Sequence, residues 1–184
     1  MSIGTPALVH LVRERIPHQV HRYEAPETDG PALARGERVH YGAAAAAALG
    51  IPPAQMLKTL VVSLEHLVGT HGNAGESGVR PAVTGLVLLA VDREASLKLV
   101  ARAFGARRAA LMDAADVTKV TGYVIGGVSP FGTKRPLPVV VDDAVLSQAR
   151  VYLSAGQRGV SIEIASSDLI RGLEARVAAI TGAE

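Results

Sequence analysis

The chain has 184 residues, of which 48% are hydrophobic and 20% charged, and its formal net charge is +2. This length fits one domain, residues 1–184, and the hydrophobic fraction is ample for a packed core. The absence of cysteine excludes disulfides, cysteine-ligated zinc and a protein thiol as nucleophile. No apolar stretch is long enough to span a bilayer and the N-terminus lacks the pattern of a signal peptide, so we expect a cytoplasmic protein.

Start and stop signals divide the first half of the chain. Thr5 and Pro6 are typical of a helix start, and Gly50 is typical of a helix end. Apolar runs indicate buried strands, whereas Gly- and Pro-rich stretches without periodicity indicate loops. In chain order, we predict a helix from Thr5 to Ile16, a strand from His18 to Glu24, a loop over 25–39, a helix from Tyr41 to Gly50, a buried strand from Leu57 to Leu64, a loop insertion over 69–81 and a second buried strand from Ala82 to Val91.

The second half mixes short strands with helices. In chain order, we predict a helix within Asp92 to Phe104 that ends at Gly105, a short strand over 107–112, a short helix over 113–120, a strand from Leu137 to Val141, two strands over 150–156 and 159–165 joined by a Gly-containing turn, and a closing amphipathic helix from Ser166 to Ile180. The order does not repeat as regular βαβ units. It predicts a mixed α/β fold, in which a mixed, partly barrel-like sheet is flanked by helices.

Lys58 interrupts the first buried strand, between Met56-Leu57 and Leu60-Val61. An ammonium at such a position loses hydration energy unless it is paired or used. In one interpretation, Lys58 lies on the wet face of the strand and extends its stem over apolar surface. In the other, it lines a pocket.

The stretch VIGGVSPFGTK is rich in glycine. Gly126, Gly127 and Gly132 allow main-chain N–H groups to approach a ligand closely, and Pro130 stiffens the loop. Such N–H groups can bind a carbonyl oxygen or an oxyanion without a special side chain. The order Thr133-Lys134 departs from the Lys-Ser/Thr order of a phosphate-binding Walker loop. An ordinary tight turn between strands is the alternative interpretation.

The histidines predict no metal centre. His18 and His21 are three residues apart, so in a strand their side chains point to opposite faces. No carboxylate cluster accompanies them, and we expect solvated surface imidazoles and no metal or other cofactor.

Three motifs together resemble one family. MLKTLVV around Lys58 is followed by TGYVIGGVSPFGTKRPLPVVVDD and then by VYLSAGQRGVSIEIASSDL. In this order they look like the YbaK family of free-standing aminoacyl-tRNA deacylases, relatives of the editing domain of bacterial prolyl-tRNA synthetases. The resemblance runs from TPALVHLVRERIPHQVHRYE almost to the C-terminus.

The resemblance implies an editing-domain fold, a substrate and a set of site residues. The substrate would be mischarged tRNA, with Cys-tRNA(Pro) for the YbaK branch, and prolyl-tRNA synthetase is an expected partner. A second hydrolytic site is needed because a synthetase pocket rejects near-isosteres poorly. The resemblance gives catalytic positions to Lys58 and Gly126. It gives substrate-binding positions to Tyr23, Tyr41, Thr59, Gly127, Ser129, Pro130, Ser154 and Ser161.

Two features leave alternatives open. The family often has His at the position of Ala25, and branch members commonly have an acidic residue at the position of Ser161. A deacylase for another amino acid, Ala or Ser, is therefore the second interpretation. A non-catalytic module that binds tRNA or a synthetase is the third. The family reaction can proceed through the thiol of the cysteinyl substrate itself, with which a cysteine-free chain is compatible, or through attack by water.

Overall fold

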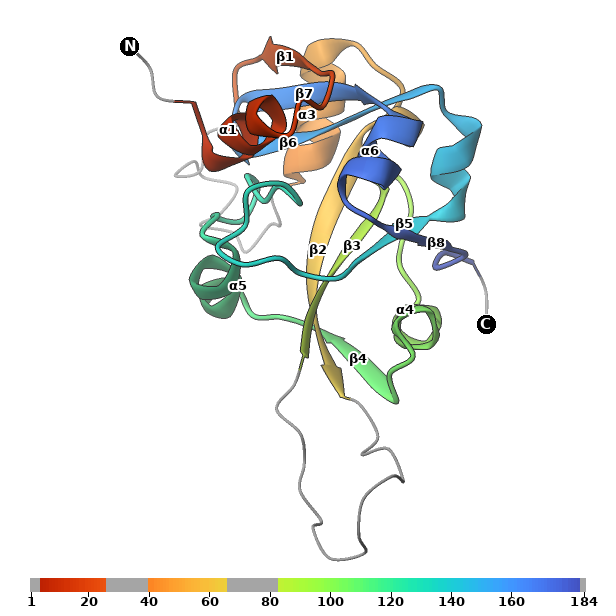
Figure 1. The fold of residues 1–184 in the computed structure, drawn as a ribbon. Coiled ribbons are helices and arrows are strands. Elements are labelled where there is room, and N and C mark those ends of the chain that lie inside the picture. Colours follow the sequence, from red (N-terminus) through yellow and green to blue (C-terminus); the bar gives the residue numbers. More distant parts are fainter. Residues whose placement is uncertain (1–3, 26–39, 66–82, 183–184) are drawn as a thin grey trace, which may run out of the picture.

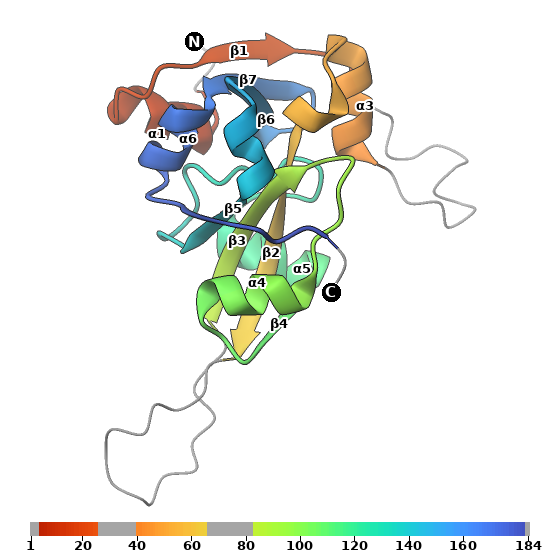
Figure 2. The ribbon, with the colours of Figure 1, turned by 90° about the vertical axis from the view of Figure 1, so that its right-hand side faces the viewer.

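The computed structural model describes residues 4–25, 40–65 and 83–182 (Figure 1). Both predicted loop insertions lie almost entirely outside these ranges. The described residues form two sheets with helices around them (Figures 1 and 2). The helices are α1 (Pro6–Arg13), α3 (Tyr41–Leu49), α4 (Leu97–Phe104), α5 (Ala114–Thr121) and α6 (Ser166–Gly172), with short 3-10 helices η1 (Pro53–Gln55) and η2 (Asp143–Ser147).

The strands divide between a three-stranded and a five-stranded sheet. The smaller sheet has the order β1-β7-β6 and the larger has the order β4-β2-β3-β5-β8. The bounds are β1 (Gln19–Arg22), β2 (Leu57–Glu65), β3 (Val83–Ala90), β4 (Arg108–Leu111), β5 (Val139–Asp142), β6 (Arg150–Gln157), β7 (Val160–Ala165) and β8 (Arg176–Ala178). β2 is antiparallel to β3 and β4, whereas β5 is parallel to β3 and β8. The mixed α/β fold is therefore confirmed, and the described strands do not close into a barrel.

β2 contributes to two cores because successive side chains of a strand point to opposite faces. Leu57 and Val61 belong to the core that also contains the inward residues of β6 and β7. Val62 and Leu64 belong to a second core, which α4 covers with Val100. Odd-numbered residues of β2 therefore face the smaller sheet, and even-numbered residues face α4. This assignment decides where the polar residues of β2 point.

Local signals set most helix ends. The Thr5 hydroxyl accepts a hydrogen bond from the backbone N–H of Leu8, and Gly50 ends α3 in the left-handed conformation. The helix predicted within Asp92 to Phe104 begins only at Leu97, because the Ser96 hydroxyl caps it. Most of the other predicted elements agree with the structure to within one or two residues.

The prediction of a closing helix from Ser166 to Ile180 is wrong after Gly172. The chain takes a left-handed conformation at Glu174, with φ of 48°, and then forms β8. β8 pairs in parallel with β5, and the buried Asp142 carboxylate at the end of β5 accepts a hydrogen bond from the N–H of Ile180 at 3.2 Å. The free edge of β5 thus outweighs the helical spacing of the sequence. Within the described residues, no helix is long and apolar enough to cross a membrane.

Candidate active site

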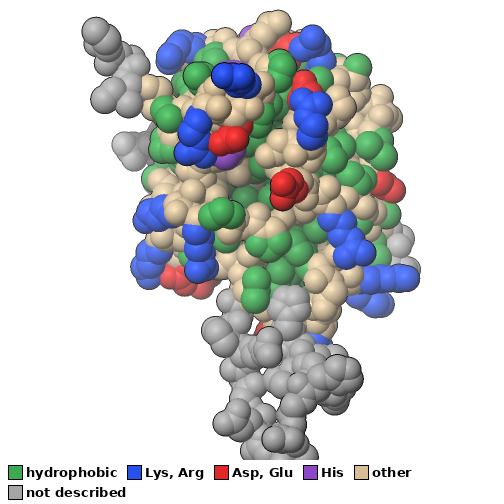
Figure 3. All heavy atoms as spheres, viewed as in Figure 1, with side chains coloured by type: hydrophobic (Ala, Val, Ile, Leu, Met, Phe, Trp, Pro, Cys, Tyr) green, Lys and Arg blue, Asp and Glu red, His purple; other side chains and the backbone are tan. Residues whose placement is uncertain are grey.

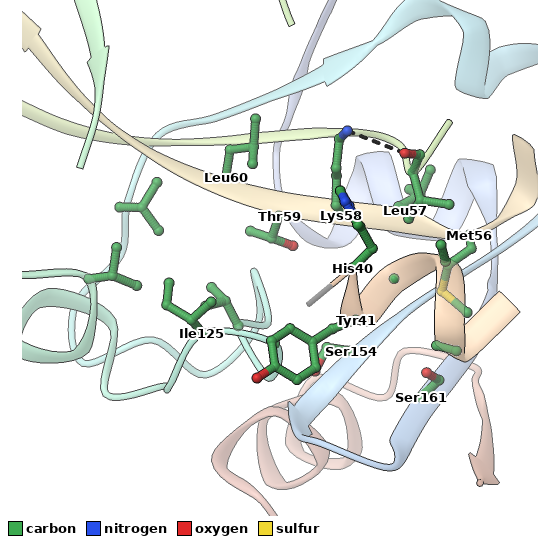
Figure 4. Close-up of a pocket in the computed structure, with 18 of the residues that line it drawn as sticks. His40, Tyr41, Met56, Leu57, Lys58, Thr59, Leu60, Ile125, Ser154 and Ser161 are labelled. Carbon is green, nitrogen blue, oxygen red and sulfur yellow. Dashed lines mark hydrogen bonds between the residues drawn. The ribbon is translucent and has the colours of Figure 1, made fainter. Parts of the chain in front are cut away.

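A cavity of about 360 Å³ lies beside the exposed edge of β2 (Figure 4). β4 pairs with β2 only over Val62 to Glu65, so the edge of residues 57–61 is left without a neighbouring β4 residue. α3 and the smaller sheet enclose the cavity from the other side. Its size is within the range of small-ligand sites, and its lining is mainly apolar with a few polar groups.

Thr59 presents unused polar groups to this cavity. Its hydroxyl oxygen is buried, and it is the one buried side-chain nitrogen or oxygen without a hydrogen-bond partner among the described residues. The backbone N–H and C=O of Thr59 also face the cavity, as the hydrogen bonds of the neighbouring residues indicate. Val61 O accepts from Met112 N at 2.9 Å on the β4 edge, while Met56 O accepts from Val91 N at 2.9 Å on the β3 edge. Because antiparallel strands alternate their hydrogen-bonding edges, the N–H and C=O of Thr59 face the cavity.

Lys58 lines the cavity, but its ammonium does not point toward the glycine turn. The side chain leaves β2 on the side opposite to Thr59 and Tyr41 (Figure 4). Nζ donates hydrogen bonds to Val91 O, at 3.3 Å, and to Arg93 O. Of the two interpretations of Lys58, a pocket lining agrees with the structure, but alternation along the strand places the ammonium at the rim of the cavity.

Burial lowers the pKa of the Lys58 ammonium, and the nearby carboxylates of Glu94 and Asp92 oppose this shift. Desolvation is the larger effect, so the charged form is held less favourably than in water. Lys58 is the only Lys or Arg among the described residues that line the cavity, and none of these lining residues is Asp or Glu.

Position 126 requires glycine because the ring of Tyr41 packs closely against its backbone. Its φ is +85°, and a Cβ at this position would lie 2.6 Å from the ring of Tyr41. The N–H of Gly127 donates to Val124 O at 2.9 Å, whereas Gly126 makes no backbone hydrogen bond within the described residues. The turn therefore brings an unused main-chain N–H to the cavity wall beside an aromatic ring.

Arg158 fixes this turn from outside. Its guanidinium lies 4.6 Å from the centroid of the Tyr41 ring. The same group donates two hydrogen bonds to Ile125 O, from Nε at 3.0 Å and from a terminal nitrogen at 2.8 Å. One side chain thereby joins the start of α3 to the glycine turn.

The remaining predicted residues separate into two groups. Tyr23, Tyr41, Ser154 and Ser161 line the cavity together with Lys58, Thr59 and Gly126. Ser154 and Ser161 are direct neighbours across β6 and β7, which places both hydroxyl groups on the same face of the smaller sheet. Gly127, Ser129 and Pro130 do not line it; they are buried, and the Ser129 hydroxyl accepts from Phe131 N at 3.3 Å. The predicted glycine loop thus contributes Gly126 to the cavity and buries the following residues.

Three residues at the site were not predicted from the sequence: His40, Ile125 and Arg158. His40 directly precedes α3 and Ile125 directly precedes Gly126, so both adjoin residues that were singled out. Arg158 occupies the turn between β6 and β7, where a charged residue is common, and its contacts with distant segments give no signal in the sequence.

The family model for the aminoacyl-tRNA editing domain matches residues 37–171. The chain therefore belongs to the aminoacyl-tRNA editing domain family, as the sequence motifs predicted. The matched segment contains α3, the edge of β2, the glycine turn and the β6–β7 pair, which are the parts that build the cavity. Family membership assigns the chain to aminoacyl-tRNA editing and supports deacylation as its chemistry.

Two curated relatives are deacylases of different amino acids. The chain is 30% identical over 141 residues to "Putative Cys-tRNA(Pro)/Cys-tRNA(Cys) deacylase EbsC" of Enterococcus faecalis, with 76% of each protein covered. It is 31% identical over 87 residues to "Multifunctional Ser/Thr-tRNA deacylase ProXp-y" of Escherichia coli, with 47% of this chain and 52% of that protein covered. The second match spans about half of each protein.

Solved structures share the fold. A "putative trans-editing enzyme for prolyl tRNA synthetase" superposes with a TM-score of 0.71 at 22% identity, covering 99% of this chain and 100% of that one. A hypothetical protein superposes with a TM-score of 0.74, also at 22% identity, covering 96% and 99%. At this identity the likeness shows the editing-domain fold alone.

Proposed function

We propose that this protein is a trans-editing deacylase that removes cysteine from mischarged Cys-tRNA(Pro). One observation carries the proposal: the cavity places an unpartnered Thr59 hydroxyl, the free backbone edge of β2 and the turn at Gly126 around one apolar space. These groups can hold an ester and its amino acid without supplying a nucleophile. The relation to EbsC, over 76% of both chains, supports cysteine as the amino acid.

In the proposed complex the ester carbonyl lies between β2 and the glycine turn. The Gly126 N–H donates to the carbonyl oxygen and strengthens this bond as negative charge develops there. The Thr59 hydroxyl and the β2 edge hold the α-amino group or the ribose. Tyr41 limits the depth of the space, because its ring packs against Gly126.

The proposed bond cleavage uses the thiol of the substrate. The cysteinyl sulfur loses its proton and attacks the ester carbonyl carbon, so that a C–S bond forms. The bond between that carbon and the ribose oxygen breaks, and the ribose oxygen takes up a proton. The products are a thiolactone and uncharged tRNA. Neither cysteine nor carboxylate occurs among the described residues of the cavity, which agrees with a reaction whose nucleophile comes from the substrate.

Lys58 would act by releasing its carbonyl partners and turning toward the ester. Its ammonium is held by Val91 O and Arg93 O at the rim, and its stem is long enough to change rotamer. The pKa of Lys58 is lowered because burial removes water from its ammonium. An oxygen atom of the substrate would replace part of this lost hydration. Lys58→Ala should abolish deacylation and preserve the fold. Lys119→Ala, which removes an exposed ammonium paired with Asp116, is the matched control and should keep full activity.

A second candidate is a deacylase for Ser-charged tRNA. The hydroxyl groups of Thr59, Ser154 and Ser161 gather in the cavity and can bind a hydroxyl of the amino acid. The resemblance to ProXp-y favours the same class of substrate. In this alternative, water replaces the substrate thiol as nucleophile.

The test is a panel of Cys-, Ala-, Ser- and Pro-charged tRNA(Pro) incubated with the purified protein. We expect loss of the Cys ester and retention of the Pro ester. Methylation of the cysteinyl sulfur should stop the reaction if the thiol attacks, and should leave it unchanged if water attacks. Full activity of Lys58→Ala on every charged tRNA would remove the role proposed for Lys58. Stability of all four esters, in the presence and absence of prolyl-tRNA synthetase, would refute deacylation.

A further inference from the structure

A second hollow is lined by residues of α4, of the turn that follows it and of the start of β4. In Figure 2, α4 faces the viewer. The hollow is a shallow groove of about 710 Å³, and its lining contains four basic side chains and no acidic one among the described residues. The basic residues are Lys98, Arg102, Arg107 and Arg108. Basic side chains also gather at the lower right of the face in Figure 3, on the side where Figure 1 shows α4. We call this hollow the basic groove.

Local structure aligns these cations. Lys98 and Arg102 are four residues apart on α4, so they lie on the same face of the helix. Gly105 then turns the chain in the left-handed conformation, with φ of 66°, and returns it as β4. The N–H of Arg107 donates to Glu65 O at 2.7 Å, which fixes the return strand against β2. Arg107 and Arg108 lie on this return and line the groove together with Lys98 and Arg102.

The three arginines are available for a ligand. Arg102, Arg107 and Arg108 are exposed, and none of them makes a side-chain hydrogen bond or ion pair with the described part of the chain. The chain elsewhere pairs several of its exposed arginines, for example Arg13 with Glu14 and Arg171 with Asp168. The positive charge of these three exposed arginines is complementary to a polyanion.

β4 connects the basic groove to the cavity. Arg108 begins this strand and lines the groove, whereas Leu111 ends it and lines the cavity. Three residues of strand correspond to about 10 Å at a rise of about 3.3 Å per residue. In addition, Arg108 pairs with Glu65, which places its side chain on the same face of the larger sheet as Thr59. The basic groove is therefore within reach of the phosphates nearest to an RNA end that enters the cavity.

We propose that the basic groove binds the phosphate backbone of the tRNA acceptor stem, next to the 3′ end whose ester occupies the cavity. This inference rests on the proposed function, because it takes aminoacylated tRNA as the ligand. The cavity admits only the aminoacyl end, and the groove supplies the salt-dependent attraction that orients the duplex. An acidic protein segment is the competing occupant that the experiment distinguishes.

The experiment compares two triple variants of equal charge. Arg102→Gln, Arg107→Gln and Arg108→Gln together neutralise the basic groove. Arg13→Gln, Arg15→Gln and Arg171→Gln form the control, since they remove the same charge from the end of α1, from the turn that follows it and from α6. These segments lie far from α4 and β4 (Figures 1 and 2). Binding of uncharged tRNA(Pro) transcript is measured over a range of salt concentrations. Deacylation is measured with Cys-tRNA(Pro) and with a cysteinyl ester of adenosine alone.

The groove variant should bind the transcript at least 10-fold more weakly, and the slope of log K against log salt should fall by about 0.7–0.9 for each phosphate that the variant no longer neutralises. Its KM for Cys-tRNA(Pro) should rise with little change in kcat, and cleavage of the adenosine ester should be unchanged. The control should match the wild type. Equal weakening in both variants, or an unchanged slope in the groove variant, would overturn the proposal. Polyaspartate is the probe for an acidic protein segment. The proposal would also be overturned if the wild type bound polyaspartate and the groove variant did not, while the groove variant still bound the transcript.

The outcomes separate this inference from the proposed function. In one outcome, the slope of log K against log salt is smaller in the groove variant, but the wild type deacylates no charged tRNA. The groove then binds tRNA and the deacylase proposal fails. If deacylation proceeds and the groove variant retains both its KM and its salt slope, the deacylase proposal stands and the groove has no role in binding tRNA.

Discussion

Thr59→Val should stabilise the protein and at the same time weaken its activity. The substitution keeps the shape of the side chain and removes the hydroxyl that has no partner among the described residues. A buried polar group without a hydrogen bond costs about 1–3 kcal/mol, so the variant should gain roughly 1 kcal/mol in the free energy of unfolding. For a protein of this size, that gain corresponds to a rise in Tm of about 2–4 °C.

The reduced activity follows from the same hydroxyl. If it bonds to the bound substrate, its removal should lower kcat/KM by roughly 10-fold, which is the equivalent of about 1.4 kcal/mol. Thermal unfolding and deacylation of Cys-tRNA(Pro) measure the two effects on the same preparation. A substitution that raises stability and lowers activity is expected at a binding site where a polar group has a hydrogen-bond partner only when the ligand is bound.

Thr121→Val is the matched control for this argument. The Thr121 hydroxyl is buried as well, but it donates to Val117 O at 2.7 Å and accepts from Tyr123 N at 3.1 Å. The same substitution there should destabilise the protein by about 1–3 kcal/mol, because it leaves partners unsatisfied. A Thr59→Val variant that is destabilised as much as Thr121→Val would refute the reasoning, since the hydroxyl would then have a partner in solution. Unchanged kcat/KM would refute its contact with substrate.

Three further outcomes are expected. Gly126→Ala should lower kcat/KM at least 10-fold and reduce stability by about 1–3 kcal/mol, measured by kinetics and urea unfolding, because φ of +85° and the ring of Tyr41 leave no room for Cβ. Arg158→Gln should raise KM and lower Tm only slightly, because it removes the contacts with Tyr41 and Ile125 O while the core stays intact. A KM equal to that of the wild type would contradict this role of Arg158. Burial raises the pKa of Tyr123 to about 12 from its usual 10.0, so stability is retained below pH 10 and lost as pH rises toward 12; this decline in urea midpoint should be smaller in Tyr123→Phe.

Several features could be read from the sequence because they depend on neighbouring residues. The left-handed glycine at Gly50 ends its helix as predicted, and the apolar run from Leu57 to Leu64 forms β2. Short-range capping and chain stereochemistry decide such elements, so they need no knowledge of the fold. The three motifs together likewise identified the family, which the match over residues 37–171 shows.

The geometry of the cavity came from residues far apart in the sequence. The edge of β2 is open because β4 pairs only from Val62 onward, and this register follows from packing against α4. The direction of Lys58 depends on which face of β2 meets which core, which its position in the motif does not reveal. Arg158 reaches Tyr41 and Ile125 across more than thirty positions of chain.

The sequence by itself determined the class of this protein, most of its helices and strands, and the types of residue that build its site. Only the tertiary structure decided that the last segment forms β8, that Gly126 lines the cavity while Ser129 is buried behind it, and that the Lys58 ammonium rests on two carbonyl groups at the rim. The physical reason is the range of the interactions. Propensity and capping act within a few residues, whereas strand register, burial and hydrogen bonding between distant segments are set when the whole chain packs.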